Sequence, residues 1–154
     1  MKFTPNTTLA GSVLISSQLA EPGELLLRGI QSRFELSGGD VVGFGPDLEK
    51  NDLEYITMIA QGVFSGIGSE NILYVLPKAY ENFSSVDRYA LRHNLETIVR
   101  LGPPRGVFIV AATTSADPAL FGATFDLATK VTIRFSPQAS AILDKLTNRQ
   151  QIAA

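Results

Sequence analysis

At residues 107–112 the chain reads Val-Phe-Ile-Val-Ala-Ala, six apolar residues without a break. A run of this kind, with no alternation of polar side chains, is typical of a strand that is covered on both faces. Two further runs have the same character, Val13-Leu14-Ile15 and Ile72-Leu73-Tyr74-Val75-Leu76. We therefore expect these three segments to be the central strands of a parallel sheet.

The stretches between these runs have the spacing of helices. Leu27, Ile30 and Phe34, for example, recur every three or four residues, which places their side chains on one helix face. Alternating strands and helices predict an α/β domain. The expected elements are a strand at 13–15, a loop over 18–23, a helix at 24–34, a strand at 40–44, a helix at 52–64, a strand at 72–76, a helix at 85–101, strands at 107–112 and 130–135, and a last helix that opens at Ser136-Pro137.

These elements predict a five-stranded, mostly parallel sheet in the order 5-1-4-3-2, with helices on both faces. The strand at 130–135 alternates apolar and polar residues, which favours a place at the sheet edge. The length of 154 residues is that of one domain. We place this single domain at residues 1–146 and a tail at 147–154.

Composition narrows the classes of function. Hydrophobic residues make up 45% of the chain and charged residues 18%, which is the balance of a folded protein. With 13 basic and 15 acidic residues there is no basic excess to bind a phosphate backbone, so nucleic acid is not expected as a partner. The absence of cysteine excludes thiolate chemistry and fits a cytoplasmic location. No run approaches the roughly 18 apolar residues of a membrane span, so we expect no direct membrane contact.

Between Ile72 and Asp144 several motifs follow one another in a recognisable order. An apolar strand comes first, then the basic-glycine turn Arg100-Leu101-Gly102, the strand tip Ala112-Thr113-Thr114 and the segment Ile142-Leu143-Asp144. This series resembles the second half of RecA-like P-loop motor domains of the FtsK/SpoIIIE and HerA type. The resemblance covers about half the chain. It implies a three-layer RecA-like P-loop fold.

The phosphate-binding loop of this family is degenerate here. Such a loop reads G-x-x-x-x-G-K-[ST], so that backbone N–H groups and a lysine hold phosphate and a hydroxyl holds magnesium. At that spacing the chain has Gln18, Gly23, Glu24 and Leu25. Glu24 would repel a triphosphate. If that charge is what excludes nucleotide, the changes Gln18→Gly, Glu24→Lys and Leu25→Thr should create affinity for ATP.

The family's other nucleotide motifs are also replaced. Pro77 and Lys78 stand where two carboxylates would hold magnesium and activate water, and Thr114 occupies the position of a polar sensor, often glutamine. His93, the only histidine, has no carboxylate at a spacing that suggests a relay, so we interpret it as structural. We accordingly predict no catalytic residue, no cofactor and no metal site.

The leading hypothesis is a non-catalytic, degenerate RecA-like domain that serves as a structural, regulatory or partner-binding module. The resemblance extends to the coupling ATPases of type VII secretion, whose chains string several motor domains together. It implies a protein partner, namely a neighbouring motor domain, a secretion substrate or a second copy, within a membrane-anchored assembly. Two alternatives remain open: a divergent ATP-binding DNA translocase domain, and an unrelated α/β domain that binds a small ligand.

Overall fold

The computed structural model describes residues 9–66, 71–85, 88–114 and 121–133. Within these ranges the chain alternates strands and helices as the sequence predicts. In chain order the elements are β1 (Val13–Ser17), α1 (Ala20–Leu36), β2 (Asp40–Gly43), α2 (Lys50–Ser65), β3 (Ile72–Leu76), α3 (Ala79–Ser85), α4 (Arg88–Leu101), the short 3-10 helix η1 (Pro103–Arg105), β4 (Val107–Thr113) and β5 (Thr129–Ile133).

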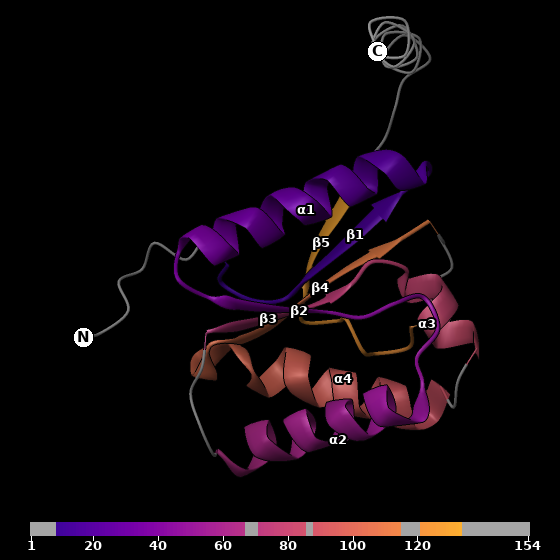
Figure 1. Cartoon of the computed structure of the whole chain (residues 1–154). Helices are drawn as coiled ribbons and strands as arrows, with labels where there is room; N and C mark the ends of the chain where they lie inside the picture. The colour runs from indigo at the N-terminus through magenta and orange to yellow at the C-terminus, as the bar shows by residue number, and fades with distance from the viewer. Residues whose placement is uncertain (1–8, 67–70, 86–87, 115–120, 134–154) are drawn as a thin grey trace, which may run out of the picture.

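The five strands form one sheet in the order β2-β3-β4-β1-β5, and all neighbouring pairs are parallel. The predicted order, the three central strands and the edge position of β5 are therefore confirmed. Helix α1 covers one face of the sheet, while α2, α3 and α4 cover the other (Figure 1). The protein is thus a three-layer α/β structure.

The alternation of side chains along β4 produces the two cores of this structure. All seven residues of β4 are buried. Ile109 and Ala111 point into the core under α2, α3 and α4, whereas Phe108 and Val110 point into the core under α1. A central strand buried on both faces needs an apolar residue at nearly every position, and that is why the run at 107–112 predicts the fold so well.

Helix α1 begins at Ala20, so the expected loop over 18–23 is confined to Gln18 and Leu19, and its prediction over residues 20–23 is wrong. Pro22 lies in the first turn, where backbone N–H groups have no acceptor within the helix, so the N–H group that proline lacks costs no hydrogen bond. Gly23 is buried against β1, and a Cβ atom built on it would lie 3.3 Å from the Cβ of Ser17. Proline followed by glycine indicates a turn in most contexts, but here the two residues permit a helix start that packs closely on a strand.

Helix α3 is absent from the elements that the sequence pattern predicts. Its inner residues Ala79, Asn82 and Phe83 are fully buried. The Asn82 side-chain amide donates hydrogen bonds to the backbone carbonyl oxygens of Gly45 (2.9 Å) and Pro46 (2.6 Å), which ties α3 to the loop after β2. With seven residues, α3 is too short for a clear helical period, and the buried asparagine interrupts its apolar face.

The C-terminal predictions meet the structure only in part. Strand β5 runs from Thr129 to Ile133, one residue earlier at its start than expected. The remainder of the predicted strand, the last helix opening at Ser136-Pro137 and the tail at 147–154 lie outside the described residues.

Two glycine substitutions test the packing at the start of β4. Gly102 has ordinary helical φ and ψ angles, but a Cβ there would overlap the carbonyl oxygens of Ile98 and Val107. Gly102→Ala should therefore lower the free energy of unfolding by about 1–3 kcal/mol, measured from the urea unfolding midpoint. Gly62→Ala, within α2 and with no atom within 4 Å of the new Cβ, should be neutral or stabilise by up to about 1 kcal/mol. Equal midpoints for the two variants would contradict the packing described here.

Candidate functional site

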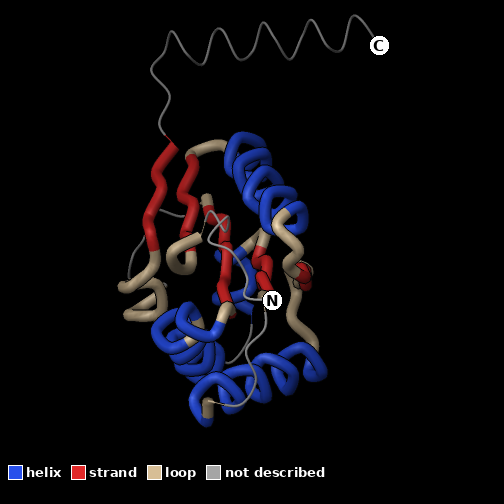
Figure 2. Tube along the Cα trace, turned by 90° about the vertical axis from the view of Figure 1, so that its left-hand side faces the viewer, coloured by secondary structure: helices blue, strands red, loops and turns tan. Residues whose placement is uncertain are grey.

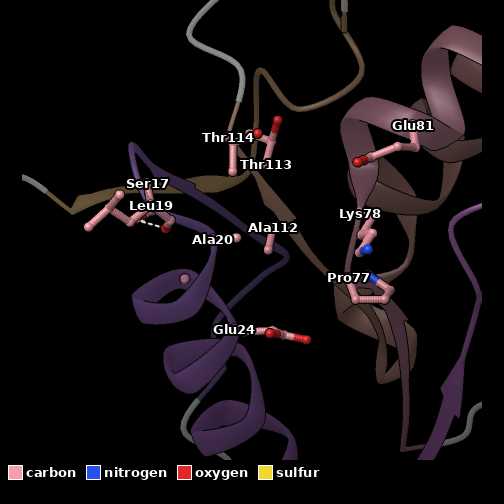
Figure 3. Close-up of a pocket in the computed structure, with 11 residues that line it drawn as sticks. Ser17, Leu19, Ala20, Glu24, Pro77, Lys78, Glu81, Ala112, Thr113 and Thr114 are labelled. Carbon is pink, nitrogen blue, oxygen red and sulfur yellow. Dashed lines mark hydrogen bonds between the residues drawn. The ribbon is translucent and has the colours of Figure 1, made fainter. Parts of the chain in front are cut away.

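A hollow of about 180 Å³ lies where β1, β3 and β4 end. Because the three strands are parallel neighbours, their carboxyl ends meet at one edge of the sheet, where open α/β sheets place their ligands. Helix α1 supplies one wall and α3 the other (Figure 3). The lining residues are Ser17, Leu19, Ala20, Gly23, Glu24, Pro77, Lys78, Glu81, Ala112, Thr113 and Thr114.

Most residues that the sequence analysis singled out meet at this hollow. Gln18 and Leu25 do not line it, because Gln18 is an exposed residue of the connection and Leu25 is 64% exposed on another side of α1. The sequence analysis compared Gln18 with the first glycine of a phosphate-binding loop and Leu25 with its hydroxyl residue. Neither position contributes to the hollow. The five that line it are Gly23, Glu24, Pro77, Lys78 and Thr114.

Glu81 is the lining residue that sequence reasoning missed. It comes from α3, the helix that the pattern did not predict, and its carboxylate reaches into the space opposite α1 (Figure 3). The sequence contains only a weak signal for the helix that carries Glu81. Ala79, Asn82 and Phe83 have helical spacing, and a helix with that buried face turns the side chain of residue 81 toward the strand tips.

The connection between β1 and α1 has only two residues, Gln18 and Leu19. Leu19 is extended, and its carbonyl oxygen accepts a hydrogen bond of 2.6 Å from the Ser17 hydroxyl. A phosphate-binding loop has four residues between its two glycines, and it needs them to bring successive N–H groups around the phosphates. A two-residue connection is too short to surround a phosphate in that way.

The charges around the hollow are mixed, with a negative excess. Glu24 extends from α1 and Glu81 from α3, and Lys78 lies on the α3 side (Figure 3). Glu24 is 3.7 Å from the guanidinium of Arg28, but both side chains are largely exposed, so this ion pair adds little. Two carboxylates against one amine disfavour a polyphosphate. Among the described residues, no group of three or more histidine, aspartate or glutamate side chains is placed to hold a metal ion.

The size of the hollow gives an independent limit. Sites for drug-sized molecules and cofactors usually occupy about 300–1,000 Å³. The hollow at the strand tips offers about 180 Å³, which is below this range.

A second depression lies between α2 and α4, and we call it the α2–α4 groove. It has a volume of about 270 Å³. Its one aromatic lining residue, Phe64, is 73% exposed, and the others are Ala60, Gln61, Ser65, His93, Asn94 and Thr97. His93 is exposed in this groove rather than packed in a core. The Asn94 amide donates a hydrogen bond of 3.0 Å to the Thr57 hydroxyl, which joins the two helices beside it.

No protein-family model and no curated protein sequence matches this chain. None of the helices in the described part of the chain is both long and apolar enough to cross a membrane. Function is therefore inferred from the geometry of the hollow and the groove, together with the order of the sequence motifs.

Changes at Asn82 test how the α3 wall is held. Asn82→Ala removes two hydrogen bonds and should lower the free energy of unfolding by about 1–3 kcal/mol. Asn82→Asp should cost more at neutral pH, because a carboxylate would then face the carbonyl oxygens of Gly45 and Pro46. The excess cost of Asp over Ala should shrink at acidic pH, where the protonated carboxyl can donate a hydrogen bond to one of these carbonyl oxygens. Thermal unfolding at both pH values gives the comparison, and an Asp variant as stable as the Ala variant at neutral pH would refute the role of this amide.

Proposed function

We propose that the chain is a non-catalytic domain of the RecA-like P-loop type that acts by binding other proteins. The order β5-β1-β4-β3-β2 is the one expected of that fold. In such a sheet, the tips of β1, β3 and β4 are where a motor would hold and hydrolyse ATP.

The observation that carries the proposal is the two-residue connection after β1. It removes the backbone loop on which ATP binding in this fold depends. Glu24, Pro77 and Lys78 add to this, since they put a carboxylate, an imino acid and an amine at the positions of the lysine and the two acidic residues. A domain that keeps the fold but lacks the nucleotide-binding residues would act by binding other proteins through its surface.

The exposed aromatic ring of Phe64 in the α2–α4 groove supports a protein partner. Aromatic side chains surrounded by polar groups are common anchors of protein interfaces. The partner classes that we propose are a neighbouring motor domain, a secretion substrate or a second copy of the chain. We further propose a cytoplasmic setting within a membrane-anchored, type VII secretion-like assembly.

Titration calorimetry with ATP and magnesium tests the loss of nucleotide binding. We expect no binding to the unmodified chain. We expect none either after Gln18→Gly, Glu24→Lys and Leu25→Thr together, because these changes restore the letters of the motif without lengthening the connection. This revises the expectation from sequence alone.

Each other outcome of the titration has a definite meaning. Micromolar binding by the unmodified chain would overturn the proposal in favour of a divergent motor. Binding by the triple variant alone would mean that the charge of Glu24, and not the short connection, excludes the nucleotide. The restored variant must keep the unfolding midpoint of the parent for this comparison to count.

Introducing a charge into the α2–α4 groove tests whether this surface binds a partner. Phe64→Asp should leave the unfolding midpoint unchanged, because the ring is 73% exposed, and should abolish retention of partners by the intact chain used as bait. Met58→Asp is the matched control, since Met58 lies on the same helix, is 60% exposed and does not line the α2–α4 groove. If both variants retain the same proteins as the parent, the groove is not the contact surface.

A further inference from the structure

The walls of the hollow at the strand tips carry charges of both signs. Helices lie on both sides of the strands (Figure 2), with α1 on one face of the sheet and α3 on the other (Figure 1). Glu24 belongs to α1, Lys78 directly precedes α3, and Glu81 belongs to α3. In the view of Figure 3, the Lys78 amine lies between the two carboxylates. The hollow therefore offers one cationic group with an anionic group on either side.

This order of charges disfavours ligands that carry only one sign of charge. An anion that approached Lys78 would also meet the carboxylates of Glu24 and Glu81. A cation without a negative group would be drawn to a carboxylate and repelled by the nearby amine. A ligand that pairs with all three groups needs one carboxylate and two ammonium groups. Its excess of one positive charge would balance the excess of one negative charge in the hollow.

The carboxylates can take up such a ligand without losing contacts within the chain. A carboxylate has about four acceptor sites on its two oxygens. Glu24 lies 3.7 Å from the guanidinium of Arg28, in a pair that is largely exposed. An ammonium group in the hollow can therefore pair with Glu24 while the contact with Arg28 persists.

The uncharged part of the lining fits a short hydrocarbon chain. Apolar groups of Leu19, Ala20, Pro77 and Ala112 lie among the charged residues. Basic side chains combine a methylene stem, which packs on apolar surface, with a cationic head that remains with water or an anion. The lining thus has a counterpart for each part of a basic side chain.

The volume of the hollow limits the size of the ligand. One water molecule occupies about 30 Å³ of the liquid, so the 180 Å³ of the hollow equals the space of about six waters. Covalently bonded atoms lie about 1.5 Å apart, whereas hydrogen-bonded oxygens lie about 2.8 Å apart. The same space therefore accommodates a molecule of about ten non-hydrogen atoms, which is the size of a single basic amino acid.

We infer that the hollow binds a free α-amino acid with a cationic side chain. Lys78 pairs with the carboxylate of the ligand, Glu24 and Glu81 pair with its two ammonium groups, and the apolar lining covers its methylene stem. The hollow and the α2–α4 groove share no residue. Binding in the hollow is thus independent of a protein partner at the groove, and a titration that fails here leaves the proposed function standing.

Titration calorimetry of the intact chain with four matched compounds tests this assignment. L-lysine carries all three charges, L-norleucine lacks the side-chain ammonium, and 1,5-diaminopentane lacks the carboxylate. Nα-acetyl-lysinamide lacks both main-chain charges and so represents a lysine within a protein. We expect L-lysine to bind at least about tenfold more tightly than each of the others, because each hydrogen-bonded charge contributes about that factor.

Two results of this titration would overturn the inference. Absence of binding with L-lysine at about 10 mM would show that the hollow is no site for it. Equal affinities for L-lysine and Nα-acetyl-lysinamide would mean that the hollow receives the side chain of another protein and not a free amino acid.

Substitutions in the lining assign the three charges. Glu24→Gln and Glu81→Gln should each weaken L-lysine about tenfold, and Lys78→Gln should weaken L-lysine but not 1,5-diaminopentane. Glu35→Gln is the matched control, since Glu35 is an exposed residue of α1 that does not line the hollow, and it should leave the affinity unchanged. All four variants should keep the unfolding midpoint of the parent. Unchanged affinity in any lining variant, or an equal loss in the control, would contradict the assignment.

Discussion

The structure depends on the insertion of β4 between β1 and β3. Each of its seven residues is buried, and its backbone bonds to both neighbours. The buried hydroxyl of Ser12 accepts a hydrogen bond of 2.9 Å from the Ile109 N–H group, which adds a side-chain link where β1 begins. A strand so placed requires helices on both faces of the sheet, because neither face can be left to water.

The same insertion brings the ends of β1, β3 and β4 together and so creates the hollow. What the hollow can hold is set by how the chain leaves those strands. After β1 it enters α1 almost at once, with Gly23 allowing the close approach, and after β3 it enters α3 through Pro77 and Lys78. The framework of a ligand site is thus present, and the connection after β1 is only two residues long.

The sequence predicts the sheet well because burial on both faces leaves an unmistakable mark, a run of apolar residues. It predicts local connections less well. Pro22 and Gly23 indicate a turn by residue type, yet both belong to a helix in which Gly23 packs closely against Ser17. This tertiary contact cannot be read from the local sequence. The sequence does not predict the position of Glu81, because the buried Asn82 interrupts the apolar face of the short helix that carries it. The convergence of Glu24 and Lys78 could be foreseen from the order of the strands alone.

The distance along the sequence between β1 and its inner partner has a consequence for biosynthesis. Ser12 and Ile109 are 97 positions apart, and β5 follows later still, so β1 acquires its two neighbouring strands only after β2, α2, β3, α3 and α4 have been synthesised. Until then the backbone of β1 lacks both strand partners, although α1 can already pack on Val13 and Ile15. Late closure of a parallel sheet is slow and exposes the nascent chain to misassociation. A strand that waits for partners so far along the chain is therefore exposed for longer than one paired by a hairpin.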